Sequence, residues 1–160
     1  MSIKEAINQL RAYNGPLGLT LHNGATDASL RLVEETFGIT LHDDFKEFYR
    51  FSDGFETVED VFNMIPLVEI IDTKKRHVNN PLYIAEYMIY SDMWHLEVNE
   101  KNPDEYSISV VDFHGRKIVL TNSLGEFISR FLKGGVFEIG GLYAWADEIR
   151  AKPQRCRKYV

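Results

Sequence analysis

Four side chains of metal-ligand or acid–base type fall on two neighbouring stretches of alternating sequence. His95 and Glu97 share one face of a predicted strand, and Asp112 and His114 share a face of another. If these strands pair in register, the four groups could bind a metal ion or exchange protons, as in a hydrolase. The chain has no HxxxH, HExxH or CxxC spacing, so a solvated sheet face is the favoured interpretation and no metal is expected.

Nucleophilic and nucleotide chemistry have less support. Cys156 lies among arginines, which favour a reactive thiolate, but it falls in a C-terminal tail where no pocket is expected to orient a substrate. The chain has no Gly-x-Ser-x-Gly elbow, and neither Gly134-Gly135 nor Gly140-Gly141 has the spacing of a phosphate-binding loop. The sequence therefore predicts a protein that binds rather than an enzyme, with no cofactor.

The charge of the chain is unevenly distributed. Its 160 residues carry 18 basic and 24 acidic groups, but five basic groups lie in the last eleven residues, in a basic tail that starts at about residue 150. An acidic body repels nucleic-acid phosphate and attracts basic partners, so no direct contact with nucleic acid is expected. Solubility alone also accounts for acidity. The tail lacks interleaved aromatic residues for stacking on bases, which favours a solvated tail.

Length and composition predict a single domain over residues 1–160. The hydrophobic fraction of 44% is typical of a globular core. No apolar run approaches the roughly 20 residues of a membrane span, and the N-terminus has no secretory signal pattern. The single cysteine fits a reducing compartment, so a cytoplasmic location without a membrane partner is expected.

The periodicity of the chain predicts helices at both ends and strands between them. Ser2 with Glu5, and Ser123 with Glu126, form capping boxes that begin helices. The other helices are expected to start at Thr26 or Asp27, at Asp43 or Asp44, and after Gly140-Gly141, and residues 17–24 are expected to form a loop. Predicted strands cover 83–90, 93–98, 106–113 and 116–120. Any strand within the apolar run 64–71 is expected to lie at a sheet edge or to start at Pro66, because proline lacks a backbone donor.

Short connections between these strands favour antiparallel hairpins. Within them, Trp94, Leu96 and Val98 alternate with Met93, His95 and Glu97. One face of the sheet is therefore apolar and the other partly polar. The predicted fold class is α+β, a mainly antiparallel sheet with helices packed on one face.

At this point the order of elements resembles a known family. Residues 37–49 and Ser52-Asp53-Gly54 are similar to the pattern of the SUKH superfamily of Smi- and Knr-like proteins. Residues 66–70, 84–86 and 127–132 resemble its later segments, and the similarity is strongest over residues 26–133. His42 stands where the family usually has proline.

The resemblance implies a function as well as a fold. Many bacterial members look like immunity proteins that bind and neutralise a cognate toxin, often a nuclease, by stoichiometric binding; other branches are regulators. The expected partner is thus a protein toxin with a basic surface. The alternative is a regulatory adaptor or a small-ligand sensor that uses the open sheet face as its pocket. The sequence does not predict an oligomeric state.

The open face and the loops near it are the predicted contact surface. Acids there would meet lysine or arginine of the partner, and Tyr90 would supply an apolar anchor. The contact residues, all expected to be exposed, are Asp53, Glu56, Glu59, Asp60, Glu86, Tyr90, His95, Glu97 and Asp112.

Overall fold

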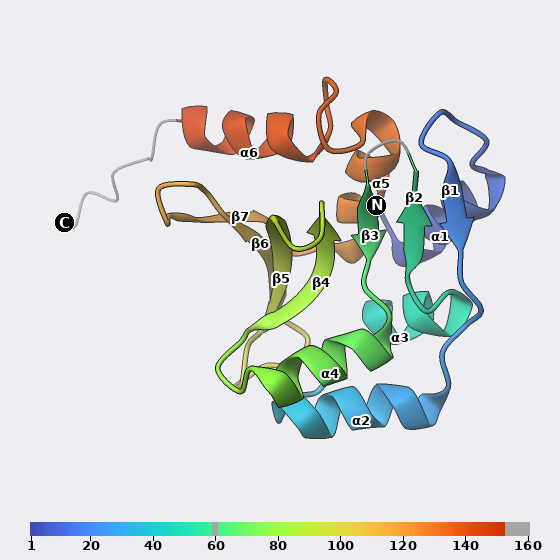
Figure 1. Cartoon of the computed structure of the whole chain (residues 1–160), viewed down its shortest axis with the longest axis vertical. Helices are drawn as coiled ribbons and strands as arrows, with labels where there is room; N and C mark the ends of the chain where they lie inside the picture. Colours follow the sequence, from blue (N-terminus) through green and yellow to red (C-terminus); the bar gives the residue numbers. More distant parts are fainter. Residues whose placement is uncertain (59–60, 153–160) are drawn as a thin grey trace.

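Each strand of the sheet pairs with the strand next to it in sequence. The computed structural model describes residues 1–58 and 61–152, and these form one seven-stranded antiparallel meander with six helices (Figure 1). The strands are β1 Leu19–Leu21, β2 Phe55–Thr57, β3 Phe62–Met64, β4 Leu82–Tyr87, β5 Asp92–Val98, β6 Tyr106–Val111 and β7 Lys117–Thr121. The helices are α1 Ile3–Ala12, α2 Asp27–Phe37, α3 Asp43–Phe51, α4 Leu67–Arg76, α5 Leu124–Gly134 and α6 Leu142–Ala151. The predicted α+β fold with an antiparallel sheet is confirmed.

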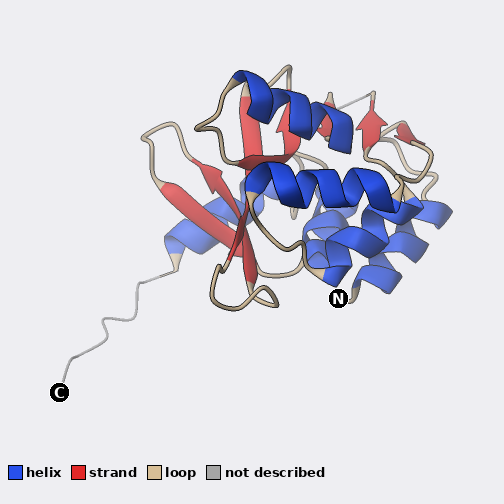
Figure 2. Ribbon diagram, turned by 90° about the horizontal axis from the view of Figure 1, so that it is seen from below, coloured by secondary structure: helices blue, strands red, loops and turns tan. Residues whose placement is uncertain are grey.

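The apolar face of the sheet is covered by aromatic contacts to the helices. Phe55 of β2 and Phe62 of β3 both stack on Phe131 of α5, with ring centroids 5.9 Å and 4.0 Å apart. Trp94 of β5 is fully buried and meets Phe127 of the same helix. In Figure 1, α1 and α5 lie behind β1–β3, and α2 and α4 lie side by side in both views (Figures 1 and 2). This packing leaves the opposite face of the sheet for the candidate site.

Local signals position the first three helices. The capping box of α1 is present, with Glu5 Oε2 accepting from Ser2 N at 2.8 Å. Gly38 ends α2 in the left-handed conformation, as predicted. Helix α3 begins at Asp43, and its N-cap is His42, whose Nδ1 accepts from Asp44 N at 3.1 Å. The residue that departs from the family pattern therefore supplies an acceptor that proline lacks.

Two predictions for short segments are wrong. The run 64–71 is not an edge strand: β3 ends at Met64, and Pro66 precedes helix α4. Helical spacing wins because Leu67, Ile70 and Ile71 are buried along one side of that helix. Residues 17–24 are not all loop, because residues 19–21 form β1 against β2, a pairing too distant in sequence for local patterns to reveal.

Other boundaries differ by a few residues. Strand β4 ends at Tyr87 rather than at residue 90, because residues 88–90 adopt left-handed conformations in a turn. The second capping box is half formed: Ser123 Oγ accepts from Glu126 N, but the Glu126 carboxylate accepts from Thr121 Oγ1 instead of from Ser123 N. None of the described helices is long and apolar enough to cross a membrane.

Candidate protein-binding face

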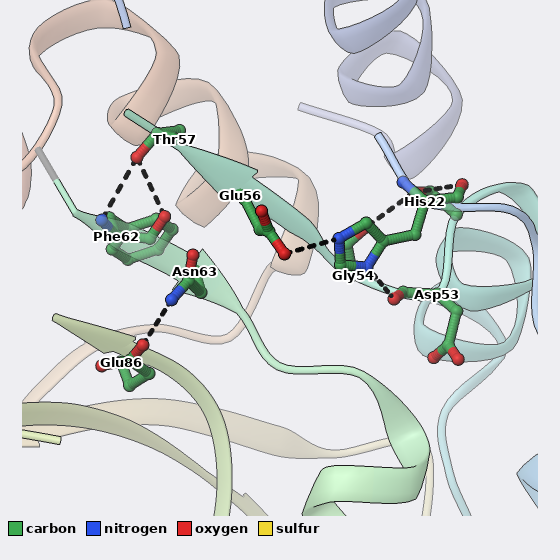
Figure 3. Close-up of polar contacts among 9 residues, drawn as sticks. His22, Asp53, Gly54, Glu56, Thr57, Phe62, Asn63 and Glu86 are labelled. Carbon is green, nitrogen blue, oxygen red and sulfur yellow. Dashed lines mark hydrogen bonds and ion pairs between the residues drawn. The ribbon is translucent and has the colours of Figure 1, made fainter. Parts of the chain in front are cut away.

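A row of polar residues crosses the face of the sheet that points away from α1 and α5. The registers place Thr20, Glu56, Asn63, Glu86 and Met93 next to one another on β1 to β5. Figure 3 shows Glu56, Asn63 and Glu86 on three adjacent strands. We call this row, together with Tyr83, His95 and Glu97 on β4 and β5, the outer face.

Glu56 is the exposed acid of this row. Its side chain is 64% exposed, and its Oε1 lies 3.3 Å from His22 Nε2 (Figure 3). The other ring nitrogen of His22 lies 2.9 Å from the backbone oxygen of Asp53. Both partners are acceptors, so the imidazole completes both contacts only when it carries two protons. The Asp53 carboxylate itself accepts from Leu67 N at 2.8 Å and thus caps α4.

Glu86 is the buried centre of the row. Only 6% of the residue is exposed, and its two oxygens accept from Asn63 Nδ2 at 2.5 Å and from Tyr90 N at 2.8 Å. Burial raises the pKa of Glu86 above its ordinary value. Burial, and then the charge of Glu86, raise the pKa of Glu69 on α4, which accepts from the hydroxyl of Tyr90. No ion pair to either carboxylate occurs within the described part of the chain.

A second group of polar residues on the outer face includes an ion pair that spans β6. Lys117 of β7 and Glu97 of β5 make an ion pair of 2.8 Å, and because β6 lies between these strands, the pair passes over it. Beneath are His95, 5% exposed, and Ser109, fully buried, whose hydroxyl makes no hydrogen bond to the described residues. Burial lowers the pKa of His95 despite the nearby Glu97, while Lys117 holds the pKa of Glu97 below its ordinary value.

Asp112 and His114 do not join His95 and Glu97. Asp112 lies in the turn between β6 and β7, with its side chain 5% exposed and paired to Arg116 at 2.9 Å and Arg150 at 3.4 Å. Backbone hydrogen bonds, chiefly from Arg116 N, lower its pKa. Residues 1–58 and 61–152 contain no group of three or more His, Cys, Asp or Glu side chains placed to hold a metal ion.

The structure therefore brings part of the predicted contact set together. Glu56 on β2 and Glu86 on β4 lie in one row across the sheet. His95 and Glu97 lie on the same face, on the neighbouring strand β5. The expected exposure is wrong for Glu86, His95 and Asp112, because hydrogen-bonding and ion-pairing neighbours cover them. Asp53 and the expected anchor Tyr90 are half-buried. Glu59 and Asp60 lie outside the described residues, as does Cys156.

The sequence-based set lacks Asn63, Glu69 and Lys117, each of which hydrogen-bonds to one of its members. The alternation Phe62-Asn63-Met64, with buried residues on either side of the asparagine, is a signal that could have found the first. Glu69 and Lys117 reach the face from α4 and from the last strand, so only the tertiary structure reveals their contacts.

The structure defines an α+β domain in which α1 and α5 pack behind an antiparallel meander and a polar row crosses the opposite face. Comparison with protein families identifies it further: the model of the SMI1/KNR4 family (SUKH-1) matches residues 24–130, and the chain belongs to this family. The comparison with curated proteins gives no match.

Proposed function

We propose that this protein is an immunity protein that binds a cognate toxin through its outer face and neutralises it without catalysis. The observation that carries the proposal is the Glu56–Asn63–Glu86 row, which places two carboxylates, the exposed Glu56 and the buried Glu86, on the sheet face opposite α1 and α5. Membership of the SUKH-1 family supports a binding role, because many bacterial members resemble immunity proteins.

The proposed mechanism is competition for the surface that the toxin uses on its substrate. A toxin nuclease holds a phosphate backbone with lysine and arginine, and an acidic strip offers the same groups a different anion. Exposed carboxylates such as Glu56 and Glu97 would speed association at low salt. Glu86 is already desolvated and fixed by two hydrogen bonds, so a partner cation reaching it would remove an existing cost of burial.

Charge reversal on the outer face tests the assignment of the site. The double variant Glu56→Lys with Glu97→Lys is expected to weaken toxin binding by about tenfold or more, since two attractive contacts become repulsive. Glu35→Lys with Asp104→Lys changes the net charge equally at exposed positions on α2 and in the loop after β5, and serves as the control. Equal affinities of the two folded variants would remove the outer face as the binding site.

Growth of cells tests the function itself. The C-terminal domain encoded by the neighbouring gene is expressed with and without this protein. Rescue that depends on the protein is the expected result. No toxicity, or toxicity without rescue, would contradict immunity and favour an adaptor or sensor role.

A further inference from the structure

The turn between β4 and β5 holds three consecutive non-glycine residues in left-handed conformations. The φ angles are +47° for Met88, +53° for Ile89 and +62° for Tyr90, and Val61 in the facing β2–β3 connection has a φ of +50°. Such angles cost of order 1 kcal/mol per residue and are least suited to β-branched side chains such as Ile89 and Val61. Strain of this kind persists only where surrounding contacts fix it.

Those contacts are present on both sides of the turn. Glu86 accepts from Tyr90 N at 2.8 Å, and Ser91 N donates to the Tyr87 carbonyl at 3.0 Å. Ser91 Oγ donates to the Met88 carbonyl at 2.8 Å, and Met88 N donates to the Val61 carbonyl at 3.2 Å. The turn is therefore a rigid element.

The rigid turn holds large apolar side chains in solvent. Ile89 is 86% exposed and Met88 is 52% exposed. Tyr87, just before the turn, meets Phe137 of the α5–α6 connection with ring centroids 5.2 Å apart, which brings that connection alongside. Figure 1 shows the end of β2, the start of β3, the β4–β5 turn and the α5–α6 connection at the same end of the molecule. We define the apolar end as the exposed residues of these segments: Val58, Val61, Met88, Ile89, Phe137 and Ile139.

The residue type at position 89 conflicts with stability of the isolated protein. Asparagine and glycine adopt left-handed conformations at lower cost than isoleucine, and a solvated isoleucine gains nothing from burial. A position where the sequence breaks a local rule without compensation inside the fold indicates a role outside it. Exposed apolar patches beside polar residues are typical of protein interfaces, and rigid anchors lose little entropy on binding.

We propose that the apolar end is the anchor of the interface with the toxin, and that Ile89 inserts into an apolar recess bordered by lysine or arginine. This proposal rests on the proposed function and deepens it. The turn is joined to the acidic row through Glu86, so the partner would cover both surfaces at once. The outer face would steer the toxin, and the apolar end would slow its dissociation.

The charges around the apolar end favour a basic partner over a second copy of this chain. Three described acids lie on or beside its segments: Glu138 is exposed, Asp92 is half-buried and accepts from the hydroxyl of Tyr143, and Glu86 is buried next to the turn. One base, the exposed Lys133, lies beside the same described segments, with its stem next to Gly140. Two copies meeting at this end would bring like charges together around the apolar contact, whereas a basic surface would pair with them. A toxin that binds nucleic acid has such a surface.

The variant Ile89→Asn separates binding from folding. Asparagine removes the apolar side chain and suits the backbone better, so the thermal midpoint of the variant is expected to equal or exceed that of the wild type. Binding to the toxin domain of the neighbouring gene, measured by calorimetry with the full-length protein, is expected to weaken about 30-fold. Val78→Asn is the matched control, because Val78 is 73% exposed and lies in the α4–β4 connection.

Each outcome bears on a different part of the proposal. Unchanged affinity of Ile89→Asn, with growth still rescued, would overturn the anchor and leave the proposed function intact. A dimer of the wild type that Ile89→Asn dissociates in sedimentation would assign the apolar end to a second copy and overturn the proposal. A lowered thermal midpoint would show that Ile89 stabilises the fold and remove its premise. Failure of the wild-type protein to rescue growth would overturn the proposed function, and with it the toxin-binding role of the apolar end.

Discussion

Replacing Glu86 by alanine is expected to destabilise the protein by about 2–4 kcal/mol. The Glu86 carboxylate is buried and accepts hydrogen bonds from Asn63 Nδ2 and Tyr90 N. Its removal takes this acceptor away from both donors. Each unsatisfied buried donor costs about 1–3 kcal/mol. The alanine variant no longer buries a carboxylate, which recovers part of this loss. The expected destabilisation is therefore smaller than the largest combined cost of the two unsatisfied donors.

Glutamine at the same position separates hydrogen bonding from charge. Its carbonyl can accept from Tyr90 N, and rotation of the Asn63 amide restores the second contact, so the expected change at neutral pH is below about 1 kcal/mol. The raised pKa of Glu86 means that the folded state holds this proton more tightly than the unfolded state. Ionisation therefore costs stability as pH rises above 4.5, and Glu86→Gln should gain relative to the wild type over that range.

Urea unfolding at pH 4.5 and pH 7.5, followed by tryptophan fluorescence, measures these differences. Trp94 is fully buried and pairs with Ala85, next to Glu86, so it reports on this part of the sheet. Equal losses for the alanine and glutamine variants would refute the reasoning, since it assigns the loss to unsatisfied donors. A gain of the glutamine variant that does not grow with pH would refute the role of charge.

Two further predictions concern a turn and a buried base. Gly54 has a φ of +79° and a Cβ there would lie 2.2 Å from the Met64 carbonyl oxygen, whereas Gly38 has a φ of +64° with open space around it. Gly54→Ala is thus expected to cost more than about 3 kcal/mol and Gly38→Ala about 1 kcal/mol, and similar urea midpoints would contradict this. The lowered pKa of His95 means that the unfolded state binds its proton first as pH falls below 6.5. Stability should therefore fall as the pH drops below 6.5, and the stability of His95→Gln should fall less; parallel curves would contradict the assignment.

The sequence predicts those features of the fold that short-range chemistry determines. Ser2 with Glu5 and the left-handed Gly38 are local signals, and both act as predicted. Strand β1 is different, because three residues carry too little periodicity and its partner β2 lies beyond two helices. The eight residues 64–71 are too few to distinguish strand from helix periodicity, and burial of one side of α4 against the fold decided between them.

The candidate site shows the same division. Strand parity correctly assigns His95 and Glu97 to the face opposite Trp94. The burial of Glu86 and His95 depends on groups from other segments. The backbone N–H of Tyr90 donates to Glu86, and Lys117 of β7, two strands from β5, pairs with Glu97 above His95. Strand order is a property of the tertiary structure, so exposure could not be predicted from alternation.

The left-handed turn is the feature for which the sequence gives least warning. Asn-Gly or Asp-Gly would signal positive φ angles, but Met88-Ile89-Tyr90 contains neither. The residues read as the end of a strand because isoleucine and tyrosine favour extended structure. The conflict between residue type and conformation became visible only with the backbone angles, and it is the basis of the proposed anchor.

The most direct test of the proposed function is a titration of toxin activity. The purified toxin domain of the neighbouring gene is held at a concentration well above the dissociation constant, and its activity is measured as this protein is added. Neutralisation by binding predicts a linear loss of activity that ends at one equivalent. Complete loss at a small fraction of an equivalent would indicate turnover and contradict a non-catalytic mechanism, and undiminished activity at several equivalents would contradict toxin binding.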